Sequence, residues 1–116
     1  MGARMLQQAV RQFLEAEGWD VEADGAILQA TRGESEVVIG ILRPEEVPGF
    51  VERSEGSSAS LAAILLDPLS DADVIHLEEV GILAFDRTDI EDVVLAGWLK
   101  KGRPPASPFL EFLRGA

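Results

Sequence analysis

Carboxylates are the residues of this chain with the most evident potential for chemistry. Five of them fall near the ends of predicted strands: Glu22, Asp24, Glu34, Glu36 and Asp67. Mg²⁺ needs only one or two carboxylates together with phosphate oxygens and water, so such acids are candidate ligands for a site that cleaves phosphodiesters. The alternative, which the high density of acids favours, is that they are turn residues and solvated charges on strand faces. No lysine precedes residue 100 to assist a cleavage reaction.

Other residue types that support catalysis are scarce. The chain has no cysteine and a single histidine, which excludes a thiolate site and a histidine-based metal cluster. That histidine, His76, falls three residues after Asp73 on a predicted helix, where an ion pair or a solvated position is expected. The serines of residues 54–60 lack a nucleophile elbow, and no glycine-rich phosphate signature is present. We therefore predict no catalytic, cofactor-binding or metal-binding residue, and whether the chain is an enzyme stays open.

Charge is the most unusual global property. There are 21 Asp and Glu against 10 Lys and Arg, a formal net charge of −11. Nucleic-acid binding needs a basic face, so the overall charge disfavours it. The acidity is explained either by hydration in a salty cytoplasm or by the binding of a basic partner. Locally, Arg32, Arg43 and Arg53 either line one edge and contact phosphate or pair with the nearby Glu34, Glu45 and Glu52, and pairing is the favoured alternative.

Hydrophobic periodicity predicts an α/β fold with the element order αβββαβαβα. Helices are expected over residues 3–17, 44–53, 70–80 and 88–98, and strands over 19–24, 26–31, 35–42, 61–66 and 81–86. Residues 26–42 form an antiparallel hairpin, whereas the later strands, joined by helices, run parallel. Ser70 is expected to cap the third helix, and Thr88 with Glu91 to form a capping box for the last. The result is a central mixed sheet flanked by helices.

The last segment differs in character from the rest. Residues 1–102 are predicted to form a single α/β domain, followed by a proline-spaced tail over residues 103–116 that carries Phe109, Leu110, Phe112 and Leu113. These apolar residues either dock onto their own domain or a symmetry mate, or insert into a groove of another protein. We expect a homodimer. No apolar stretch approaches a membrane span and no signal peptide is evident, so a cytoplasmic location is expected.

The segments FLEAEGWDVE, LAAILLD, GILAFD and TDIEDVV, arranged around the hairpin, resemble the restriction-endonuclease-like (PD-(D/E)XK) superfamily, in particular its small archaeal Holliday-junction-resolvase and Mrr-like members. The resemblance implies a nuclease that holds Mg²⁺ through an Asp at the start of the second strand and an acid two residues before a Lys in the third. The matching positions of this chain hold Ala26, Gly40 and Leu42. None of these side chains binds a metal, so the catalytic motif is expected to be lost.

The resemblance thus predicts a non-catalytic interaction or structural module that is derived from a nuclease-like fold and associated with nucleic-acid-processing machinery. Two alternatives stay open. One is a divergent Mg²⁺-dependent nuclease that uses the relocated carboxylates Glu22, Asp24 and Glu36. The other is an acidic regulator of a basic nucleic-acid enzyme.

Overall fold

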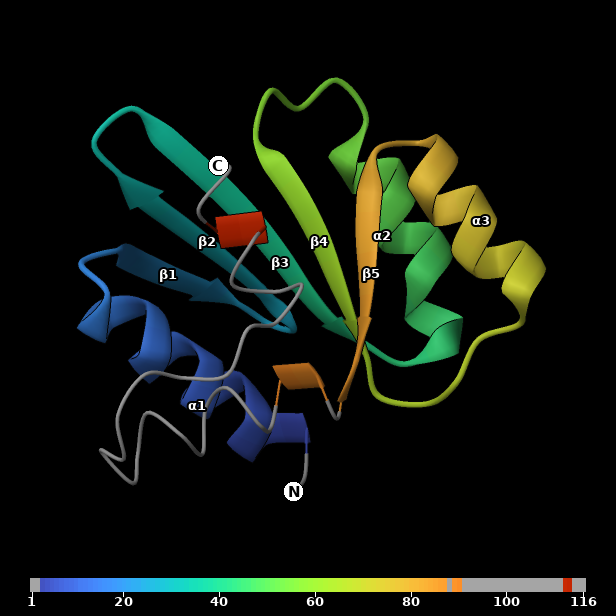
Figure 1. The fold of residues 1–116 in the computed structure, drawn as a ribbon, viewed down its shortest axis with the longest axis horizontal. Coiled ribbons are helices and arrows are strands. Elements are labelled where there is room, and N and C mark those ends of the chain that lie inside the picture. The colour runs from blue at the N-terminus through green and yellow to red at the C-terminus, as the bar shows by residue number, and fades with distance from the viewer. Residues whose placement is uncertain (1–2, 88, 91–111, 114–116) are drawn as a thin grey trace.

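A five-stranded mixed sheet organises the chain, with helices on both of its faces (Figure 1). The computed structural model describes residues 3–87, 89, 90, 112 and 113. Its elements in chain order are α1 (Ala3–Ala16), β1 (Asp20–Asp24), β2 (Ile27–Arg32), β3 (Ser35–Leu42), the short 3₁₀ helix η1 (Pro44–Glu46), α2 (Val47–Ser54), β4 (Ser60–Leu65), α3 (Asp71–Glu79) and β5 (Ile82–Asp86).

The strands lie in the order of the sequence, β1-β2-β3-β4-β5. β1, β2 and β3 pair antiparallel, whereas β3, β4 and β5 pair parallel. The predicted α/β fold with a mixed sheet is therefore confirmed. β3 is the central strand, and both of its faces are covered by helices. Its continuously apolar sequence from Val37 to Leu42 predicts this burial.

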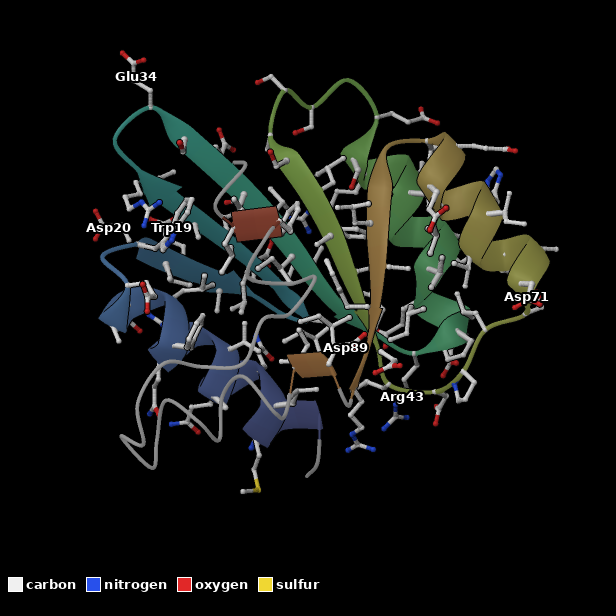
Figure 2. The ribbon with its side chains drawn as sticks, viewed as in Figure 1. Trp19, Asp20, Glu34, Arg43, Asp71 and Asp89 are labelled. Atoms are coloured by element: carbon white, nitrogen blue, oxygen red, sulfur yellow. The ribbon has the colours of Figure 1, made fainter. Side chains whose placement is uncertain are left out.

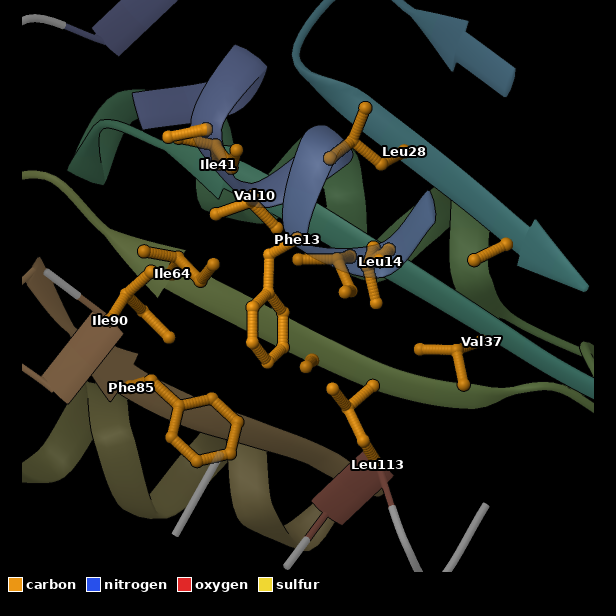
Figure 3. Packing of buried hydrophobic residues seen from close by; sticks show 14 of the residues in the cluster. Val10, Phe13, Leu14, Leu28, Val37, Ile41, Ile64, Phe85, Ile90 and Leu113 are labelled. Atoms are coloured by element: carbon orange, nitrogen blue, oxygen red, sulfur yellow. The ribbon is translucent and has the colours of Figure 1, made fainter. Parts of the chain in front are cut away.

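Alternate residues of the strands divide between two hydrophobic clusters. On one face, α1 packs its apolar stripe of Leu6, Val10, Phe13 and Leu14 against the sheet (Figure 3). The sheet supplies the other side of this cluster with Leu28, Ala30, Val37, Ile39, Ile41, Ala62, Ile64 and Phe85. These residues form the larger core of the protein.

Helices α2 and α3 cover part of the opposite face (Figure 1). They contribute Val47, Phe50 and Leu77, which pack on Ile27, Leu42, Leu61, Ala63, Leu65 and Ile82 of the strands. Ser70 caps α3 as predicted, because its side-chain oxygen accepts a hydrogen bond from the backbone N–H of Asp73 at 3.3 Å. β1 and the outer part of β2 extend beyond these helices, and the residues of β1 are exposed or half-buried.

Two local predictions need correction. Trp19 does not open β1, which begins at Asp20; the indole is only 3% exposed and packs in the α1 cluster instead. Pro48, which the sequence predicts to interrupt or tilt the helix over residues 44–53, does not interrupt α2. The chain first makes the η1 turn, so Pro48 falls in the first turn of α2, where a missing N–H costs no intrahelical hydrogen bond.

The final helix begins earlier than predicted. Arg87 is already helical, and Asp86 and Asp89 form a reciprocal cap. The Asp86 Oδ1 accepts from the Asp89 N–H at 2.9 Å, while the Asp89 Oδ2 accepts from the Asp86 N–H at 3.3 Å. Thr88 and Glu91, the predicted capping box, lie outside the described residues.

No helix in the described part of the chain has both the length and the apolar character needed to cross a bilayer.

Two of the four apolar tail residues lie against the α1 cluster. Leu113 is 5% exposed within it (Figure 3). The ring centre of the half-buried Phe112 lies 5.9 Å from that of Phe85. Phe109 and Leu110 lie outside the described residues. Because Leu113 packs on its own domain, its burial contributes to folding; a role of the tail in partner binding stays a prediction.

We predict that Leu113→Ala lowers the free energy of unfolding by about 2–4 kcal/mol, because it removes buried methyl groups and leaves a cavity. The measurement is urea denaturation followed by circular dichroism. Met5→Ala is the matched control, since Met5 is 60% exposed and its loss should change stability by less than about 0.5 kcal/mol. Equal stability of Leu113→Ala and the wild type would contradict this packing.

Candidate functional site

The three positions matched to nuclease ligands come together at one end of the sheet. Gly40 pairs with Ile27, the residue after Ala26, and the Ala26 carbonyl accepts a hydrogen bond from the Ile41 N–H at 2.9 Å. Leu42 ends β3 two residues further on and is 2% exposed. The three matched positions are therefore neighbours at this end of the sheet.

The ring of Phe50, from α2, occupies the space beside Gly40 and Leu42. A Cβ atom added to Gly40 would lie 3.0 Å from both Cδ2 and Cε2 of Phe50 and 3.1 Å from Cδ1 of Leu42. Phe50 is only 3% exposed, so its ring has little room to move aside. A carboxylate at position 40 would therefore have to displace the aromatic ring that holds α2 on the sheet.

At the rim of this packed end, Asp24 forms an ion pair with Arg53. The Asp24 Oδ2 lies 2.7 Å from the Arg53 Nη2, and the two side chains are 70% and 52% exposed. An ion pair this exposed contributes little to stability. It does give the Asp24 carboxylate a cationic partner where a relocated metal site would need a free ligand.

The other two acids of the relocated-site hypothesis lie on an open part of the sheet. Glu22 pairs with Gln29, and Glu36 pairs with Thr31, which in turn pairs with Asp20. These five polar side chains line a hollow on the face that α2 and α3 leave uncovered. The side chains are solvated strand-face charges, as the alternative interpretation of the sequence predicts.

Glu22, Asp24 and Glu36 do not meet at one point. Asp24 pairs with Ile27 and, through it, with Gly40, which is four residues along β3 from Glu36. Four residues of strand span roughly 13 Å, too far for two carboxylates to share one ion. Among the described residues, no group of three or more Asp, Glu or His side chains is placed to hold a metal ion.

The three arginines do not line one edge. The Arg32 guanidinium lies 4.6 Å from the Trp19 ring centre and donates to the Glu17 carbonyl at 3.3 Å. This contact is at the opposite end of β3 from Arg43, as the labels of Trp19 and Arg43 in Figure 2 show. Arg53 pairs with Asp24, as described above.

Two of these arginines have partners other than the predicted acids: Arg32 contacts Trp19 and the Glu17 carbonyl, and Arg53 pairs with Asp24. Glu34 lies at the tip of the β2–β3 turn and points into solvent (Figure 2). For Arg32 and Arg53, the nearest acids in the sequence were the natural candidates, but the fold brings Trp19, the Glu17 carbonyl and Asp24 closer.

A groove between α2 and α3 was not predicted. It encloses about 360 Å³ between two helices that are separated in sequence by β4, and its lining includes Val47, Val51 and Leu69. Val47 and Val51 are four residues apart and therefore share one face of α2. Only the folded structure shows that Val51 on this face is partly uncovered. His76 and Asp73 line the groove together, yet no ion pair joins them; Asp73 accepts instead from the Ser70 hydroxyl at 2.9 Å.

No protein-family model, curated protein or solved structure significantly matches the chain. The relationship to restriction-endonuclease-like proteins therefore stays a prediction.

The close approach at Gly40 can be tested by substitution. We expect Gly40→Ala to lower the free energy of unfolding by about 1–3 kcal/mol, because the added methyl group overlaps the Phe50 ring and Leu42. Thermal and urea unfolding measure the change. Gly49→Ala is the matched control: it lies in α2 with nothing within 4 Å of its added Cβ, so it should stabilise the protein by about 0.5–1 kcal/mol. Two variants that change stability alike would contradict this description.

Proposed function

We propose that this chain is a non-catalytic protein-interaction module with the architecture of a nuclease-like domain. The observation that carries the proposal is the contact of Phe50 with Gly40 and Leu42. It puts a buried aromatic ring where a related nuclease would need carboxylates, water and a metal ion. Hydrophobic packing requires apolar side chains and excludes water, whereas metal coordination requires oxygen ligands and water. The side chains at this position meet the requirement of packing.

The charge of the chain supports a protein partner over a nucleic acid. A net charge of −11 repels phosphate backbones, and the described arginines are dispersed over both ends of the sheet. The same charge speeds association with a basic protein and favours it over acidic competitors. This makes a basic component of nucleic-acid-processing machinery the best candidate partner, in which case the chain would act as its acidic regulator.

A cleavage assay tests the non-catalytic part of this proposal. We expect no cleavage of branched, single-stranded or duplex DNA in the presence of Mg²⁺ or Mn²⁺, because Asp24 is paired and far from Glu36. Gel electrophoresis of labelled substrates is the measurement, with an authentic junction-cleaving enzyme as the positive control. Metal-dependent cleavage that is lost on changing Glu22, Asp24 or Glu36 to Ala would overturn the proposal in favour of a divergent nuclease.

A further inference from the structure

The α2–α3 groove combines an apolar floor with an acidic rim. Val47, Val51 and Leu69 line its floor, and Glu52, Glu55 and Asp73 stand around it. Val47 is 9% exposed and packs in the protein core. Val51 and Leu69 are half-buried and leave apolar surface uncovered. Uncovered apolar side chains and three carboxylates from α2, α3 and the segments beside them therefore line the same groove.

We infer that this groove binds a basic amphipathic segment of another protein. The inference rests on the proposed function and names the surface and the partner chemistry that the proposal leaves open. Apolar side chains of the segment would cover Val51 and Leu69, while flanking Lys or Arg side chains would reach the rim carboxylates. This arrangement is typical of a helix that lies in a groove with its apolar face inward.

Charge complementarity decides between occupants. The lining has three carboxylates and no Lys or Arg. A second copy of the chain, itself at −11, would bring like charge against like, and a nucleic acid or an anionic membrane would be repelled in the same way. A volume of about 360 Å³ holds a few side chains and not a folded domain, which favours a single segment over a broad interface.

The rim carboxylates are available for such contacts. Arg53, the nearest basic residue in the sequence, points away from the groove and pairs with Asp24 at the far side of α2. The Asp73 carboxylate accepts a hydrogen bond from the Ser70 hydroxyl, and the Asp73 backbone N–H donates to the Ser70 side-chain oxygen. These bonds fix the carboxylate at the start of α3 without neutralising its charge. Glu52 and Glu55 are exposed on the last turn of α2 and just beyond it.

The direct test is an NMR titration of the ¹⁵N-labelled full chain with a synthetic amphipathic peptide of Leu and Lys at helical spacing. We expect chemical-shift changes to concentrate on α2, α3 and Leu69, and the affinity to fall as salt is raised. A peptide with Glu in place of Lys, and one with Ser in place of Leu, should each bind at least about tenfold more weakly. Absence of binding by the Leu–Lys peptide, or shifts centred on the open face of β1 and β2, would overturn the inference.

Matched charge reversals separate the groove from general electrostatics. Glu52→Lys with Glu55→Lys, and Asp20→Lys with Glu36→Lys, change the net charge equally, but only the first pair lies on the groove. We expect the first pair to weaken peptide binding about tenfold and the second less than about threefold. Val51→Ala should also weaken binding while preserving the charge. Equal losses in the two pairs would overturn the inference.

The outcomes also distinguish the inference from the proposed function. Peptide binding that maps outside the groove, without DNA cleavage, would overturn the groove and leave the interaction module standing. Metal-dependent cleavage would overturn the module whatever the peptide does. Light scattering covers the remaining occupant: dimerisation abolished by Glu52→Lys with Glu55→Lys would assign the groove to a second copy and overturn the inference.

Discussion

The packing of the Phe50 ring on Gly40 is the contact on which the second layer of the protein depends. One face of β3 is covered by α1. On the opposite face, α2 lies close enough to the sheet to bury Phe50 and Val47. Glycine accommodates that approach without a shift of the ring, since a Cβ at position 40 would lie 3.0 Å from two of its carbon atoms. α3 packs on the same face of the sheet through Leu77, and the groove lies between the two helices.

This contact makes hydrophobic packing and metal binding mutually exclusive at one end of the sheet. A carboxylate needs water or cationic partners around it, whereas position 40 is enclosed by an aromatic ring and Leu42. A carboxylate at position 40 would cost its own desolvation and the displacement of Phe50, which attaches α2 to the sheet. Gly40 is thus a structural requirement of this chain as it now folds, and the same residue is the strongest support for a role without catalysis.

Features encoded in local sequence patterns were predictable, and features that need tertiary packing were not. The apolar runs of β3 and β4 and the Ser70 cap depend on neighbouring residues, so the sheet and its helices followed from periodicity. Trp19 looked like a strand residue because it alternates with acids, but burial beside α1 and the contact with Arg32 placed it before the strand. Arg53 pairs with Asp24, 29 residues away, a choice that no local rule contains. The groove arises in the same way, from two helices that meet only in the folded chain.

The distribution of charge and apolar surface explains why an acidic domain can still be selective. Carboxylates are spread over the open face of β1 and β2 as well as over α2 and α3, so charge by itself attracts any basic protein to many parts of the surface. Such attraction raises association rates and is screened by salt, but it fixes neither the register nor the orientation of a partner. Uncovered apolar side chains supply what charge lacks, because their burial requires a complementary shape. The α2–α3 groove is lined by both, with Val51 and Leu69 as well as Glu52 and Asp73, so long-range attraction and local fit can act on the same segment.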